Sequence, residues 1–383
     1  MCAVFRRQTT KQYLIANHHF TTALYRQIAA NREGNFIAGP ATLGFLFGLI
    51  QTAARDETGV EIRKGFGFPF PPIKIEHGVT ALLPLLNKDD LYTLKEGNKI
   101  YYKNTFEIRE EFKKAAQAFG TELESIDFRL GSAPGVVNGW VEERTQGQVI
   151  NLISGEDLNE QMRAICVSVV RFKGKWARHF QVHHTRKQNF YRRGTELIKV
   201  DTLEDTTYHG YYESRHLHCK FVKLAFESGD VTFHVVLPDE RTGLALIEAQ
   251  LETLYEIPYR RQCVRVVLPK FKLEDVINVK AMLEKLGVNK VFSAEGDLSG
   301  IAGERGDFVI DKVFQKNIID LNELGVQHEP PAPLRAGVPL PGSSKPQPIQ
   351  FIAEHPFVFF LKHGNLVVFA GRIVDPESVQ CNN

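Results

Sequence analysis

The chain has 383 residues, with 47 Lys and Arg against 45 Asp and Glu, and 43% of its residues are hydrophobic. These are ordinary globular values, so the composition excludes a disordered, collagenous or mucin-like protein. The net charge of +2 excludes an overall attraction to nucleic acid, although not a local patch. Five scattered cysteines without a C-x-x-C pair exclude a disulfide scaffold, so the hydrophobic core must stabilise the fold.

The N-terminal third predicts helices. Residues 1–13 are polar and basic and lack the apolar stretch of a secretory signal. Residues 34–54 form an uncharged run of 21, which is long enough for a membrane span. Two readings of this run are open, and the polar residues within it favour a buried helix over residues 41–54, started by Pro40, rather than a span.

The rest of the chain mixes helix and strand signals. Helices are expected over residues 110–119 and 136–153, and Val- and Ile-rich strands follow from residue 162. Residues 357–361 and 366–373 read as a terminal hairpin that is apolar on both faces. Mixed order of this kind favours a single α+β domain over residues 1–383, with a core of about 12–376, rather than a doubly wound parallel fold.

One segment, residues 329–348, interrupts this pattern. It holds seven of the 18 prolines within 20 residues, so it cannot be a helix or a central strand as it stands. The roughly 35 residues that follow are too few for a separate domain. A long exposed loop that returns to the same core is therefore favoured over a linker, and loops of this length are usually functional.

The sequence offers little support for catalysis. It has no G-x-S-x-G nucleophile motif, and Cys166 lies in an apolar strand context where a thiol is usually inert. The histidines near residues 179–184 and 216–219 lack regular metal-ligand spacing. We therefore expect no enzyme, no catalytic residues, no metal and no cofactor.

A local basic run covers residues 161–195, which contain no acidic residue. Four cations form its most regular part: Arg171, Lys173, Lys175 and Arg178. The first three alternate and can share one strand face, where they could bind a sulfated polysaccharide, although a solvated basic face is the alternative. Aromatic residues are sparse, so single-stranded nucleic acid is not an expected partner.

Several motifs together resemble one family, the serpins. They follow in family order as Asn35–Thr42, Val137–Gly147, Phe172–Trp176 with Phe180, Val267–Phe271, Asp297–Ile301, Asn322–Gly325, Glu354–Phe357 and Phe369–Arg372. Each motif alone is weak, but eight in order over residues 12–376 are strong evidence. The resemblance implies three β-sheets, eight or nine helices and an exposed reactive-centre loop at about residues 323–350.

The resemblance also implies a mechanism. Inhibitors of this family are suicide substrates: a protease attacks the loop and forms an acyl-enzyme, and the cleaved loop inserts as a central strand of the large sheet. Inhibition succeeds only when insertion is faster than deacylation of the acyl-enzyme.

The loop hinge departs from the inhibitory pattern Glu-x-Gly-Thr-Glu-Ala-Ala-Ala. The chain keeps Glu323 and Gly325 but differs at Val326, Gln327, His328, Glu329 and Pro330, and it continues with Pro331 and Pro333. Three prolines in a central strand lack three N–H donors, a cost of ~3–9 kcal/mol in all. We therefore expect loop insertion to be slow.

The resemblance further implies a polar gate beneath the inserting strand. Inhibitors resemble Ser-Pro-x-Ser there, whereas this chain has Gly39 and Thr42, and the partners on the strands are Ser168 and Gln315. Trp176 is kept where the loop would enter. We expect a gate with fewer polar contacts than in the inhibitors.

The family spacing from Gly325 puts the cleaved bond near Pro339-Leu340, while Arg335, the first basic residue of the loop, leaves a short loop to insert. We therefore predict a monomeric serpin that resembles the non-inhibitory members and binds a protein, a small ligand or a polyanion, or is a protease substrate. The alternative is an inhibitor of a serine protease cleaved near Arg335 or Pro339. Family habit favours a secreted, extracellular protein over a cytoplasmic one, and no membrane partner is expected.

Overall fold

A computed structural model describes residues 2–86, 92–326 and 347–378. Within these residues lie eight α-helices: α1 (Cys2–Ala29), α2 (Pro40–Ala53), α3 (Asp56–Phe66), α4 (Ile73–Leu86), α5 (Glu110–Ala118), α6 (Ala133–Thr145), α7 (Leu244–Glu248) and α8 (Val279–Lys285). The strands are β1 (Phe36–Ala38), β2 (Tyr92–Lys103), β3 (Thr121–Ile126), β4 (Ala164–Lys175), β5 (Arg186–Arg192), β6 (Glu196–Ser214), β7 (Cys219–Ala225), β8 (Val231–Pro238), β9 (Arg260–Pro269), β10 (Phe271–Asn278), β11 (Ile310–Asn322), β12 (Gly325–Val326), β13 (Ile349–Ile352), β14 (Phe357–His363) and β15 (Leu366–Ile373).

The strands form one six-stranded sheet and one nine-stranded sheet. The six-stranded sheet has the order β10-β11-β12-β4-β2-β3. In the larger sheet, the long strand β6 pairs first with β5, then with β9, and finally with β7. This change of partners divides the larger sheet into a layer with β5, β9 and β13 and a layer with β7, β8, β14, β15 and β1. The three layers and the mixed α+β class confirm the fold class expected from the sequence.

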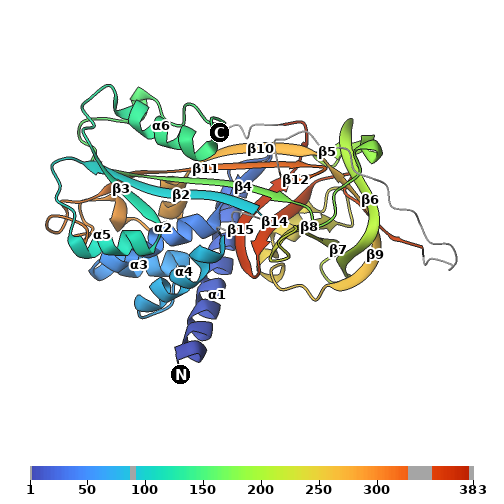
Figure 1. Cartoon of the computed structure of the whole chain (residues 1–383), viewed down its shortest axis with the longest axis horizontal. Coiled ribbons are helices and arrows are strands. Elements are labelled where there is room, and N and C mark those ends of the chain that lie inside the picture. The colour runs from blue at the N-terminus through green and yellow to red at the C-terminus, as the bar shows by residue number, and fades with distance from the viewer. Residues whose placement is uncertain (1, 87–91, 327–346, 379–383) are drawn as a thin grey trace.

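Strand β4 is the centre of the six-stranded sheet and is buried on both faces. Its residues Cys166 and Val170 belong to the main core, on the side of α2. The alternate residues Val167 and Val169 pack in a second core with Trp140 of α6. Figure 1 shows the sheet between α6 on one side and the helices α2, α3 and α4 on the other. Such two-sided burial explains why β4 reads as a continuous apolar run rather than an alternating one.

The uncharged run of residues 34–54 forms β1 and the buried helix α2, which begins at Pro40 as expected. Its two interior glycines serve packing inside the protein: a Cβ at Gly44 would lie 2.8 Å from Tyr13 Oη, and a Cβ at Gly48 would lie 2.9 Å from Ile75 Cγ2. None of the described helices has both the length and the apolar character needed to cross a bilayer.

One local prediction needs correction, and one helix was missed. The helix expected over residues 136–153 ends at Thr145, because Gln146 adopts a left-handed conformation with φ of 55°. Helix α4 was not predicted, since Gly78 and Pro84 within it are helix breakers. Gly78 is required there because a Cβ would come 2.7 Å from Tyr13 Cβ, so helix packing overrides propensity.

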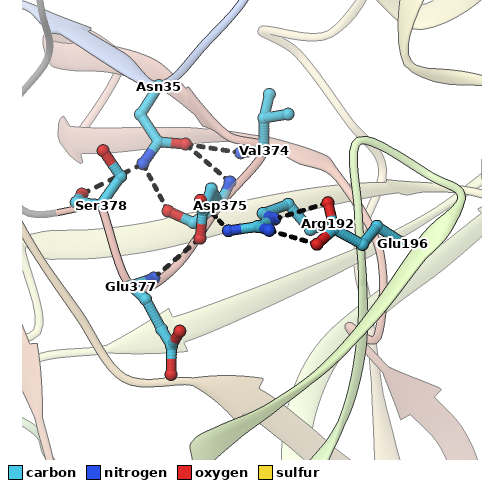
Figure 2. Close-up of polar contacts among 7 residues, drawn as sticks. All are labelled: Asn35, Arg192, Glu196, Val374, Asp375, Glu377 and Ser378. Atoms are coloured by element: carbon cyan, nitrogen blue, oxygen red, sulfur yellow. Dashed lines mark hydrogen bonds and ion pairs between the residues drawn. The ribbon is translucent and has the colours of Figure 1, made fainter.

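The terminal hairpin is central to the larger sheet. Every residue of β14 and β15 is buried, and β14 pairs with β8 while β15 pairs with β1 near the start of the chain. The segment that follows β15 is held by two side chains, as Figure 2 shows. Asn35 donates to the carbonyls of Asp375 and Ser378 and accepts from the amides of Val374 and Asp375. Arg192 binds the Asp375 carboxylate at 3.2 Å and also pairs with Glu196.

Asn35 is 4% exposed, and its four hydrogen bonds predict a large effect of its removal. Asn35→Ala should lower the free energy of unfolding by ~2–4 kcal/mol, because it leaves buried backbone groups without partners. Urea unfolding of both proteins measures this. The control is Glu196→Ala, whose side chain is 55% exposed and which should cost less than ~1 kcal/mol. An Asn35 effect no larger than the control would contradict the role assigned to this side chain.

Candidate functional site

The most unusual pairing in the six-stranded sheet is that of β4 with β11. These two strands run parallel and pair directly, from Ile310 opposite Ala164 to Ile318 opposite Arg171. At the C-terminal ends of β4 and β11 the two-residue strand β12 lies between them and is antiparallel to both. The sheet is therefore closed over most of its length and already opened at one end by the start of an additional strand.

Gly325 fits this opening because it lacks a side chain. Its φ is +142°, and a Cβ there would lie 2.0 Å from the carbonyl oxygen of Gly174. Val326 follows, is 2% exposed, and pairs with Leu321 of β11 and Gly174 of β4. The branched residue that the sequence analysis counted against insertion is thus already inserted, because its apolar side chain is accepted in the core.

Glu323 anchors the turn before the hinge. Its carboxylate accepts hydrogen bonds from Thr185 Oγ1 at 2.7 Å and Lys270 Nζ at 2.9 Å, and its carbonyl accepts from the amide of Phe180. Burial alone raises the pKa of this carboxyl, but the hydrogen bonds from Thr185 and Lys270 outweigh it and lower the pKa below the usual value. The ionised carboxylate therefore ties the hinge to the loop after β4 and to Lys270.

Trp176 covers the end of the opening. It is 1% exposed, its indole Nε1 donates to the carbonyl of Asn322 at 3.0 Å, and its backbone amide donates to the carbonyl of Leu324. Its ring stacks on Phe226 with a centroid distance of 4.4 Å. These contacts fix the two chain segments between which β12 enters.

Nearer the N-terminal ends of β4 and β11, Thr42 joins the two strands that insertion would separate. Its hydroxyl, on the first turn of α2, accepts hydrogen bonds from Ser168 Oγ of β4 at 3.2 Å and from Gln315 Nε2 of β11 at 3.0 Å. It donates to the carbonyl of Gly39 at 3.1 Å. Ser168 and Gln315 are register partners across the parallel pair, and all three side chains are fully buried.

Gly39 takes part in this network through its backbone. Gln315 Oε1 accepts from the Gly39 amide at 3.0 Å, and Gln315 Nε2 donates to the Gly39 carbonyl at 2.8 Å. A Cβ at this position would lie 2.9 Å from Gln315 Nε2 and 2.8 Å from Val170 Cγ2. Gln315 therefore binds the backbone of Gly39, at the position where the inhibitors' pattern has a serine side chain.

Two further gate residues were missed by the sequence analysis. Asn98 of β2 lies opposite Ser168 and donates to the Thr42 carbonyl at 2.9 Å. Asn317 of β11 donates to Gln315 Oε1 and to the carbonyl of Ile37. Asn317 lies two residues beyond Gln315, on the same face of β11, which is a signal that could have found it. Asn98 lies in a polar stretch of β2 and left no comparable signal.

The remaining hinge and cleavage candidates lie outside the described residues. They are Gln327, His328, Glu329, Pro330, Pro331, Pro333, Arg335, Pro339 and Leu340.

The basic candidates do not form one surface. Arg171 is 7% exposed, points toward α6, and donates to Gln146 Oε1 at 2.6 Å, and its burial lowers its pKa. Arg178 is paired with Asp205 at 3.1 Å, while Lys175 is exposed and Lys173 is half-buried. Strand β4 therefore sends its alternating cations into different environments, because α6 covers part of that face.

Comparison with known proteins identifies the fold family. A family model described as Serpin (serine protease inhibitor) matches residues 15–376. The chain is a serpin. It is 30% identical to the leukocyte elastase inhibitor of Bos taurus over 96% of this chain and 100% of the relative, and 29% identical to Iripin-2 of Ixodes ricinus over 94% and 92%. Among solved structures, Serpin48, described as a highly specific serpin of the insect Tenebrio molitor, is 36% identical with a TM-score of 0.87 over 95% of this chain and 98% of that one.

These relatives overturn the main functional prediction. The sequence analysis favoured a resemblance to non-inhibitory serpins, but relatives at about 30% identity are named as inhibitors of leukocyte elastase. That prediction was wrong because it weighed the hinge residues of one loop above the rest of the chain. The secreted location rested on family habit alone and is withdrawn too, since the names of these relatives give it no support.

The anchor at Glu323 gives a pH-dependent prediction. Because its pKa is lowered in the folded chain, the ionised carboxylate stabilises the fold above pH ~4.3, and this contribution is lost as the pH falls through the lowered pKa. Glu323→Gln should therefore cost ~1–3 kcal/mol of unfolding free energy at pH 7 and much less near pH 3.

Denaturant unfolding at the two pH values measures this difference. The control is Glu252→Gln, which removes an exposed pair with Arg26 and should change stability by less than ~1 kcal/mol. An effect of Glu323→Gln that is equal at both pH values would contradict the ionised anchor.

Proposed function

We propose that this serpin inhibits a serine protease by inserting its cleaved loop between β4 and β11. The observation that carries the proposal is β12, which starts a strand antiparallel to both neighbours at the end of an otherwise closed parallel pair. Completing that strand exchanges one parallel pairing for two antiparallel ones, which are slightly more stable per residue. The inhibitor names of several relatives support the same reading.

The printed registers allow the inserted strand to be numbered. Gly325 lies opposite Lys175 and Val326 opposite Gly174, so continuation by one residue at a time brings Ala332 opposite Ser168. The pairing of β12 with β11 gives the same result, since Ala332 then comes opposite Gln315. A small residue would thus reach the row of the buried gate network, where the Thr42 bonds to the two strands must break.

The same numbering bears on the cleaved bond. A cut after Arg335 leaves a strand that reaches Ile165, one residue short of the start of β4, so this loop is long enough to fill the opening. A cut at Pro339-Leu340 leaves four more residues for insertion. We propose both bonds as candidates, the first for a trypsin-like and the second for an elastase-like serine protease.

The prolines at positions 330, 331 and 333 slow this reaction rather than forbid it. Each removes one N–H from the new ladder, at ~1–3 kcal/mol when a buried carbonyl is left without a donor. Val326 is already paired in the described structure, so the first step of insertion is complete before any of these prolines has to enter the sheet.

The test is incubation with trypsin-like and elastase-like serine proteases, followed by denaturing gel electrophoresis. We expect a complex of the summed mass, stable to detergent, with at least one of them. Ala332→Glu should abolish the complex and leave cleavage, because it would bury a carboxylate at the gate row. Ser344→Glu, the matched control beyond both candidate bonds, should still form it. Cleavage of the unmodified chain without any complex across both protease classes would contradict the proposal.

A further inference from the structure

A pocket lies on the face of β8 and β14, beside the segment of residues 255–259. Its volume is about 610 Å³, and its wall includes Lys362 and Lys223 together with His234, Tyr255 and Tyr259. Lys362 lies opposite Thr232 of β8, at a register shift between β14 and β15. Such bulges reorient side chains relative to a regular strand.

Lys362 is a buried cation without an anion. It is 3% exposed, and its one hydrogen bond is from Nζ to the carbonyl of Tyr255 at 2.7 Å. Among the described residues, no carboxylate lies within ion-pair distance of it. Lysine is almost never buried in this way unless it is paired, because desolvation of an ammonium costs several kcal/mol. The Tyr255 carbonyl can also accept a hydrogen bond from the neutral amine.

Two carboxylates line the pocket, Asp230 and Glu256, but among the described residues neither forms an ion pair with Lys362. Lys223 is also without a carboxylate partner in the described part of the chain, and its Nζ lies 5.2 Å from the ring centre of Tyr259. His234 is held by Thr232 Oγ1 and Tyr259 Oη, each at 2.8 Å, and burial lowers its pKa, so it is neutral. The titratable and charged groups around Lys362 are Lys223, Asp230, His234, Tyr255, Glu256, Tyr259 and, from α1, His18.

We propose that Lys362 is a covalent modification site for small aldehydes that carry an anionic group, with Lys223 binding the anion. The pocket, at about 610 Å³, has room for such a compound. Condensation also removes the physical problem of the site, since it converts a buried, unpaired ammonium into a neutral imine. The proposal is independent of protease inhibition.

The chemistry balances without an external oxidant or reductant. The neutral Nζ attacks the carbonyl carbon and forms a C–N bond, giving a carbinolamine. Loss of the former carbonyl oxygen as water, with the two amine protons, gives the imine, and hydrolysis reverses the reaction.

The acidity of Lys362 agrees with this role. Burial, and to a smaller extent the cation of Lys223, lower its pKa to about 8, against the weaker opposing effect of Glu256. At pH 7.5 the fraction of reactive neutral amine is then on the order of a hundredfold above that of an ordinary lysine. The burial of Lys362 and its lack of a carboxylate partner among the described residues are geometric observations that do not depend on this pKa.

Pyridoxal 5′-phosphate, followed by borohydride reduction and peptide mass mapping, tests the site in the full chain. We expect Lys362 to be labelled at least ~10-fold faster than the exposed Lys175 at pH 7.5, with a rate that rises toward a plateau above pH 8. Lys362→Met should remove the fast labelling. Lys223→Met should slow labelling by pyridoxal 5′-phosphate but not by pyridoxal, which lacks the phosphate.

Labelling of Lys362 no faster than that of Lys175 would overturn the proposal, as would binding of the phosphate compound without a reducible adduct. If Lys362→Met does not fold, the pH profile of labelling in the unmodified chain decides between the same two results. Equal slowing of both probes by Lys223→Met would overturn the assignment of the anion to that lysine.

Discussion

The fold and the proposed function both depend on one pairing, the parallel contact between β4 and β11. Parallel strands this long are buried on both faces, and here α6 covers one face and α2 the other. On the side of α2, the hydroxyl of Thr42 binds a side chain of each strand, and Gln315 also binds the backbone of Gly39. Any strand that enters between β4 and β11 must break those bonds, so the helix beneath the sheet controls how readily the sheet opens.

The C-terminal end of the same strand pair is arranged differently. Gly174 and Gly325 meet where no side chain fits, and Glu323 and Trp176 fix the turn that delivers β12. The opening is thus prepared at one end by close backbone approach and closed further down by hydrogen bonds. This contrast is why insertion, in our proposal, proceeds in one direction from Val326 toward the gate row.

Much of the fold was predictable from the sequence, because burial leaves a clear pattern. The apolar run of α2 and the two-sided hairpin of β14 and β15 were found from composition alone. The gate chemistry was not, since Gln315 binds the backbone of Gly39, and backbone groups leave no trace in residue identity. Substitutions at Val326 and Gly39 were read as losses, although Val326 is buried and paired and the side-chain amide of Gln315 binds the backbone of Gly39. Lys362 could not be singled out from the sequence either, because its burial without a carboxylate partner arises only once the sheet is assembled.

The most direct test of the account compares the melting temperature of the intact chain with that of the chain cut after Arg335 by a trypsin-like protease. If the cut loop completes a strand between β4 and β11, the melting temperature should rise by more than ~10 °C, because the new strand gains two antiparallel neighbours. Ala332→Glu should suppress the rise, since its carboxylate would face the buried gate row. A melting temperature that is unchanged by the cut would show that the loop stays out of the sheet and would contradict the central claim.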